Sequence, residues 1–219
     1  MFLFRGMMSQ CCDKYNRERG IVMRWSQDNF VFVILSRVFD VCCLSLLWII
    51  CSLPIVTIGA STTALHAAMQ KICRDETSSM LKTFFGAFKS NFKQSTKIWL
   101  LMVLFFIVMA GDFYAFITIE AIPAAFQVVP FFCSLVFILM SFWVFSYQAR
   151  FEGKMSAVLK NAILMSMRHL GWTLLILLIF LICALLGASV AILLIFVPGI
   201  YAYIKAVIQR KVFDRYETE

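Results

Sequence analysis

The stretch LSLLWIICSLPIVTIGASTTAL, from Leu44 to Leu65, decides the fold that this sequence predicts. It lies in an apolar region from Phe30 to Met69, which is interrupted only by Ser52-Leu53-Pro54. A single helix of that length would measure about 60 Å, roughly twice the thickness of the hydrocarbon core of a bilayer. Because proline breaks a helix and restricts the residue before it, we expect two helices joined by a tight turn at Pro54.

The composition of the whole chain is that of a membrane protein. Of its 219 residues, 62% are hydrophobic and 15% are charged, and the mean hydropathy is +0.88. Soluble domains are about half apolar and a quarter charged, and disordered chains are more polar still. These values exclude a disordered chain, argue against a soluble globule and predict an all-α integral membrane fold.

Three further apolar regions, at 98–119, 128–147 and 172–208, set the predicted number of spans. A bilayer is crossed by about 20 helical residues, so the first two regions fit one span each and the last fits two. We therefore expect about six transmembrane helices in three hairpins, at 30–70, 98–148 and 172–208. The alternative is five spans, with one long first helix.

The basic residues predict the orientation. The chain has 20 Lys and Arg against 12 Asp and Glu, and all but Arg37 of the basic residues fall in residues 1–29, 71–97, 149–171 and 205–219. The connection from 120 to 127 has none. Since basic loops stay in the cytoplasm, we expect one membrane domain with a cytoplasmic N-terminus (1–29), cytoplasmic linkers (71–97 and 149–171) and a cytoplasmic tail (209–219). The excess charge predicts attraction to anionic lipid of the inner leaflet, not to nucleic acid.

Residues 78–93 form an amphipathic pattern when they are placed at 100° per residue. One face is aromatic and is flanked by lysines: Phe84, Phe88 and Phe92 beside Lys82, Lys89 and Lys93. This pattern is typical of a helix at the membrane interface. A helix packed on the cytoplasmic ends of the spans fits it equally well, and the two interpretations are compatible. Residues 155–170 show a less regular version.

Polar and small residues inside the apolar regions are the candidate functional residues. Arg37 and Asp40 are three residues apart and could form an intramembrane ion pair. Small residues that recur along the second helix predict close packing: Gly59, Ala60, Ala64 and Ala68. A candidate polar interior of the bundle comprises Asp112, Thr57, Ser61, Thr63 and His66. Each set also has a structural interpretation, as an ion pair near the interface or as hydrogen bonds that tie helices together.

We expect Asp112 to face the interior of the bundle. An acid aimed at lipid carries a penalty of about 3 kcal/mol. Gly111 beside it would let another helix approach, and the hydroxyl-rich run Thr57 to Thr63 is the expected facing surface.

The sequence contains no pattern that predicts an enzyme or a cofactor site. It has no arrangement of a nucleophile with a base, no phosphate-binding loop and no metal-ligand spacing. Eight cysteines occur without a CxxC pair, and the chain has two histidines. We therefore expect no catalysis, no metal and no cofactor.

Three segments resemble a known family: Leu46-Leu47-Trp48, Pro54 to Ser61, and FFGAFKSNFKQ from Phe84 to Gln94. They are similar to the YesL family, a group of small bacterial multi-pass membrane proteins of unknown function, over Phe30 to about Asp112. The resemblance implies a plasma-membrane protein without an established activity. It also implies association with carbohydrate uptake, because such proteins are often encoded beside sugar ABC transporters.

The leading hypothesis is an accessory membrane protein of a carbohydrate uptake system, a non-catalytic partner or modulator of sugar ABC transporter subunits. The alternatives are a small transporter or channel that uses a polar bundle interior, and a lipid-interacting scaffold; a homo-oligomer fits each of them. A polar cavity near Asp112, Thr57 and Ser61 would favour transport. A packed bundle with an exposed apolar groove would favour partner binding.

The orientation can be tested by labelling from outside the cell. A membrane-impermeant thiol reagent should reach a cysteine placed at Gln127, because the loop 120–127 is predicted to be external. It should miss a cysteine placed at Arg17 in the basic N-terminus. The opposite labelling pattern would contradict the predicted topology.

Overall fold

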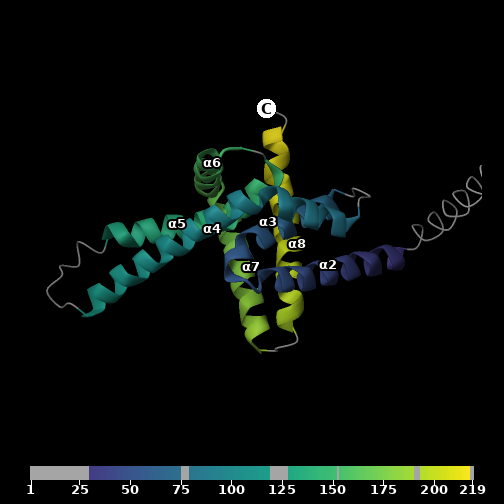
Figure 1. The fold of residues 1–219 in the computed structure, drawn as a ribbon, viewed down its shortest axis with the longest axis horizontal. Helices are drawn as coiled ribbons and strands as arrows, with labels where there is room; N and C mark the ends of the chain where they lie inside the picture. The colour runs from purple at the N-terminus through teal and green to yellow at the C-terminus, as the bar shows by residue number, and fades with distance from the viewer. Residues whose placement is uncertain (1–29, 75–78, 119–127, 152, 190–192, 218–219) are drawn as a thin grey trace, which may run out of the picture. The chain divides into compact units, whose positions relative to one another are not determined.

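The computed structural model describes residues 30–74, 79–118, 128–151, 153–189 and 193–217, and these ranges are helical except at short turns (Figure 1). The elements are α2 (Phe30–Ser52), the 3-10 helix η1 (Ile55–Thr57), α3 (Ile58–Cys73), α4 (Met80–Thr118), α5 (Val128–Arg150), α6 (Met155–Arg168), α7 (Leu170–Ser189) and α8 (Leu193–Glu217). The predicted all-helical class is confirmed over the described ranges. Contacts divide the chain into two units, Met1–Asp40 and Val41–Glu219, and the packing described below lies within the second.

Four of the described helices are long and apolar enough to cross a membrane. They are Leu35–Ser52 within α2, the whole of α4, α5 and α7. The other two elements that the six-span prediction uses are α3 and α8. Helix α3 has 16 residues, about 24 Å at 1.5 Å per residue. Helix α8 carries Lys205, Arg210 and Lys211 along its length.

The predicted turn at Pro54 is present between α2 and α3. Helix α2 ends at Ser52, and α3 begins at Ile58 after the single turn of η1. The Thr57 hydroxyl lies 2.6 Å from the carbonyl oxygen of Cys51 and 2.7 Å from that of Pro54. The Trp99 indole nitrogen donates to the carbonyl of Ile55 at 2.9 Å. Side chains therefore satisfy carbonyl groups that a broken helix leaves without partners.

Helix α4 is longer than the sequence pattern suggests. The amphipathic segment and the apolar span that were expected to meet at residue 97 form one continuous helix of 39 residues. That segment contains no proline, so no residue in it interrupts the backbone hydrogen bonds of the helix. Within its first turns Phe84 is fully buried and Phe88 is half-buried. The lysines of the same turns, Lys82, Lys89 and Lys93, are exposed.

Helix α3 forms the centre of one core although it is the shortest α-helix but one. Thirteen of its 16 residues are buried, and Ala60, Ala64 and Ala68 are completely inaccessible. It packs against α4, α5 and α8. A Cβ atom added at Gly59 would lie 2.6 Å from both the carbonyl oxygen of Ser95 and the Cβ of Trp99. Only glycine permits this approach of α3 to α4, as small residues do in membrane helix pairs.

A second core surrounds Trp143 on α5. Its indole nitrogen donates to the Thr173 hydroxyl on α7 at 2.9 Å, so its buried N–H is satisfied. Phe213 of α8 meets the Trp143 ring edge to face, with centroids 5.8 Å apart. Ile98 of α4 and Ile176 of α7 belong to the same cluster. With Val158, Ala162 and Met165 of α6 also in the cluster, this core joins α4, α5, α6, α7 and α8.

The closeness of α3 and α4 can be tested with two glycine substitutions, one on each helix. Gly59→Ala should lower the stability in detergent by about 1–3 kcal/mol, because the new methyl group overpacks the contact. Gly111→Ala should raise the stability by about 0.5–1 kcal/mol, because no described atom lies within 4 Å of the new Cβ and alanine favours helix. Equal effects of the two substitutions on the unfolding temperature would contradict the packing.

Candidate functional site

The hydroxyl groups of the predicted polar interior are engaged in packing. Ser61 donates to the carbonyl of Trp48 at 3.1 Å, which ties α3 to α2. Thr63 and Ser95 are both fully buried, and their hydroxyl oxygens lie 2.9 Å apart between α3 and α4. Together with Thr57 in the turn, these groups hold helices together. They line none of the larger cavities found among the described residues.

Asp112 departs from its predicted position. The prediction placed it in the interior against the hydroxyl run of α3, but its side chain is exposed on α4. The reason is the length of α4, whose contact with α3 lies at Ser95 and Trp99, more than three turns before Asp112. Gly111 likewise has open space around its Cα among the described residues. Asp112 lies beside an apolar groove between α4 and α5.

Arg37 and Asp40 lie three residues apart on α2, as their spacing in the sequence requires. Both belong to the unit that ends at Asp40. Their ion pair stays a prediction.

His66 takes part in a polar contact that the sequence did not predict. Its Nε2 lies 3.1 Å from the Nζ of Lys205 on α8, and both residues are 4% exposed. A lysine nitrogen can donate to the unprotonated nitrogen of a neutral imidazole, which accounts for this pair. The Lys205 nitrogen also lies 5.8 Å from the centre of the Tyr201 ring, at the outer limit of a cation–π contact. Lys205 was grouped with the basic C-terminus, yet its apolar sequence neighbours, Tyr203-Ile204 and Ala206-Val207, indicate a buried position.

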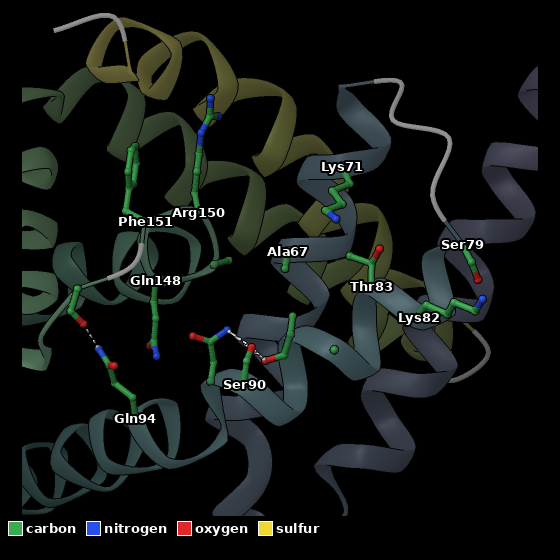
Figure 2. Close-up of a pocket in the computed structure, with 15 residues that line it drawn as sticks. Ala67, Lys71, Ser79, Lys82, Thr83, Ser90, Gln94, Gln148, Arg150 and Phe151 are labelled. Atoms are coloured by element: carbon green, nitrogen blue, oxygen red, sulfur yellow. Dashed lines mark hydrogen bonds between the residues drawn. The ribbon is translucent and has the colours of Figure 1, made fainter.

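A cleft with polar walls lies between α3, α4 and α5 and has a volume of about 740 Å³ (Figure 2). We call it the polar cleft. Helix α3 contributes Ala67 and Lys71, the first turns of α4 contribute residues between Ser79 and Gln94, and α5 contributes Gln148 at its end. Gln94 donates to the carbonyl of Gly153 at 3.0 Å and so closes one side of the cleft.

The charged side chains among the described residues that line the polar cleft are all basic. Arg150 borders the cleft, but its side chain turns away from it (Figure 2). Its guanidinium group pairs with Asp214 of α8 at 2.6 Å. Lys71 and Lys82 also line the cleft, and no ion pair joins either of them to a described residue. The described lining contains no acidic side chain. Two lysines therefore border the cleft without an acidic partner in its described walls.

Gln148 is the least satisfied polar residue of the cleft. It is 4% exposed, and neither its amide nitrogen nor its amide oxygen has a hydrogen-bond partner among the described residues. Its side chain points from α5 towards α4 (Figure 2). Buried amides normally find partners, so an unpaired one in a cavity wall is a candidate ligand contact. The sequence gives only one hint of it, because Gln148 directly follows the apolar run 128–147.

The described residues contain no group of three or more His, Cys, Asp or Glu side chains that could hold a metal ion. The described cysteines are free thiols, and only Cys73 among them is buried. The polar cleft offers nitrogen and hydroxyl donors in place of metal ligands, which suits an anion better than a cation.

Part of the chain matches a known family model. Residues 41–113 match the model described as "Protein of unknown function, DUF624". This is the YesL family. The resemblance noted in the sequence is confirmed over these residues, which include α3 and the part of α4 that lines the cleft. Searches of curated proteins and of solved structures gave no match.

The His66–Lys205 contact can be tested by a double-mutant cycle. His66→Leu should lower the stability by about 1–3 kcal/mol, because it leaves the buried lysine nitrogen without its hydrogen-bond partner. Lys205→Met should cost less, since methionine fills the space with an apolar chain. In the double variant the unfolding temperature in detergent should return most of the way towards the wild-type value. Additive losses would contradict a direct contact.

Proposed function

We propose that this protein is an accessory integral membrane protein of a carbohydrate uptake system, a non-catalytic partner or modulator of sugar ABC transporter subunits. The same proposal includes a bacterial plasma-membrane location, cytoplasmic termini and six spans in three hairpins. In that layout α3 and α8 are the second spans of the first and third hairpins. The family resemblance motivates the choice of partner.

The observation that carries the proposal is the position of Asp112 on an exposed apolar surface. Phe106 and Phe113 beside it are 69% and 57% exposed. A carboxylate at the centre of a bilayer is disfavoured by about 2.5–3.5 kcal/mol on insertion scales, so it needs a polar partner. Among the described residues Asp112 forms no hydrogen bond or ion pair, and a basic or hydroxyl side chain on a neighbouring protein would supply one.

The surface around Asp112 has a shape that suits a helix of another protein. The groove between α4 and α5 has a volume of about 370 Å³ and is lined mainly by phenylalanine, with Ser134 as a second polar group. The rings of Phe105 on α4 and Phe137 on α5 stack at 4.1 Å and join the two helices. Small polar groups at a helix surface are typical of helix association in membranes.

The channel or transporter alternative has less support. It requires a polar path through the bundle, and the hydroxyl groups of Ser61 and Thr63 are bonded within the packing. The scaffold alternative is supported by the exposed lysines of α4, which can reach lipid phosphates. A second copy of this chain is the homo-oligomer alternative for the groove.

Substitution of Asp112 tests the proposal directly. Affinity purification in mild detergent, followed by mass spectrometry, should recover sugar ABC transporter membrane subunits with the wild-type protein. Asp112→Leu should reduce this recovery about tenfold or more, because it removes the polar contact, and Asp112→Asn should retain part of it. Tyr114→Leu is the matched control, since Tyr114 is 70% exposed on the same helix and does not line the groove.

Three outcomes would count against the proposal. Recovery of only a second copy of this chain would assign the groove to self-association. Substrate flux in proteoliposomes that contain this protein alone would favour the transporter alternative. Equal recovery of transporter subunits with Asp112→Leu and with the wild type would show that the groove does not bind them.

A further inference from the structure

We infer that the polar cleft between α3, α4 and α5 binds a phosphate ester that carries free hydroxyl groups. This chemistry is shared by the headgroup of an anionic glycerophospholipid and by a soluble sugar phosphate. The inference is independent of the proposed partnership. The cleft uses Ser79 and residues 82–94 of α4, whereas the groove at Asp112 uses residues 105–113 of the same helix.

The charge of the cleft selects an anion. Lys71 comes from the last turn of α3 and Lys82 from the first turn of α4, so basic residues of two separate helices border one cavity. Arg150 adds no free charge because Asp214 engages its guanidinium group. Ammonium groups without a carboxylate partner in the described lining form strong, charge-assisted hydrogen bonds with phosphate oxygens. A cation would find no acidic ligand in these described walls.

The neutral side chains of the cleft select hydroxyl groups beside the phosphate. The Gln148 amide offers both donors and an acceptor, and all of them are unpaired among the described residues. Asn91 uses its amide nitrogen on the Ala87 carbonyl and the Ser90 hydroxyl, which leaves its carbonyl oxygen to accept from a ligand. Sugar and glycerol hydroxyls both donate and accept, as these amides require.

The size and burial of the cleft suit a small molecule. A volume of about 740 Å³ lies within the range of about 300–1,000 Å³ that small-molecule sites occupy. The unpaired Gln148 amide also has an energetic consequence. A buried amide without partners destabilises a fold, so Gln148 is better explained by a ligand contact than by packing.

Unfolding temperatures measured on the full chain in lipid nanodiscs test the inference. In nanodiscs of phosphatidylcholine alone, the probes are glucose 6-phosphate, glucose and inorganic phosphate. In a second set, phosphatidylglycerol replaces part of the phosphatidylcholine. If the ligand is soluble, glucose 6-phosphate should raise the unfolding temperature more than inorganic phosphate does, and glucose should have little effect. If the ligand is a lipid, phosphatidylglycerol should raise it without any added solute.

Paired lysine variants separate the cleft from general attraction to anions. The double variant Lys71→Gln with Lys82→Gln should lower the affinity for the effective probe at least tenfold. The control, Lys89→Gln with Lys93→Gln, removes the same charge from exposed positions of α4 outside the cleft and should leave the binding of glucose 6-phosphate within about twofold of wild type. Lys71→Arg with Lys82→Arg keeps the charge and should retain most of the binding.

Gln148→Leu provides a readout that a purely structural residue would not give. It should raise the unfolding temperature of the ligand-free protein, because it removes an unpaired buried amide. It should also lower the affinity for the effective probe about tenfold. Gln148→Glu keeps the shape of the side chain and should lower the affinity for the probe further, because its negative charge repels the phosphate. This second variant keeps the test valid if the first one fails to fold.

Each remaining outcome overturns the inference. One is the absence of any effect of glucose 6-phosphate, inorganic phosphate and phosphatidylglycerol on the wild type. Another is an equal loss of probe binding in the cleft variants and in the exposed-lysine control, which would indicate that the probe is attracted to the basic surface in general. A third is unchanged binding of the probe in both Gln148→Leu and Gln148→Glu.

Discussion

The close contact between α3 and α4 is the constraint on which the rest of the second unit depends. At Gly59 the two backbones approach so closely that a single methyl group has no room. One turn further along α3, the buried hydroxyl groups of Thr63 and Ser95 bond across the same contact. This packing fixes the remainder of α3, whose Gln70 donates to the Ser146 carbonyl on α5 at 3.0 Å. The polar cleft exists because α3, α4 and α5 meet in this arrangement.

Helix α4 carries two surfaces of different chemistry. Its first turns line the polar cleft with lysine, hydroxyl and amide groups, and its last turns form an apolar groove with α5 around one acid. Both surfaces belong to one helix of 39 residues, which would be about 58 Å long. A ligand in the cleft and a membrane partner in the groove would therefore contact one continuous element at positions several turns apart.

The sequence predicted the features that depend on local pattern. Pro54 marked the turn between α2 and α3, since proline acts on its own residue and its neighbour. The small residues Ala60, Ala64 and Ala68 marked a face of α3, and that face is buried. The amphipathic pattern from residue 78 predicted a helix with lysines along one side. It did not predict where α4 ends, because neither a glycine nor a change in polarity necessarily breaks a helix.

The features that depend on several helices were not predicted. Asp112 was assigned to the interior from its chemistry alone, but its environment is set by where α4 leaves α3, which is a tertiary property. Lys205 meets His66 across 139 positions of sequence, and Gln148 shares its cleft with a residue as distant as Lys71. No local period encodes these contacts. They follow from the packing of α3 among its neighbours.

Disulfide trapping between α3 and α4 tests this packing most directly. In a chain whose native cysteines are replaced by alanine, Thr63→Cys and Ser95→Cys place two thiols where the hydroxyl oxygens lie 2.9 Å apart. Mild oxidation in native membranes should link them within one chain, so that cleavage between the two positions leaves the fragments joined. The neighbouring pair Thr62→Cys and Ser95→Cys should stay unlinked, because Thr62 bonds to Trp48 on α2. Failure of the first pair to link, or equal linking of both pairs, would contradict the account.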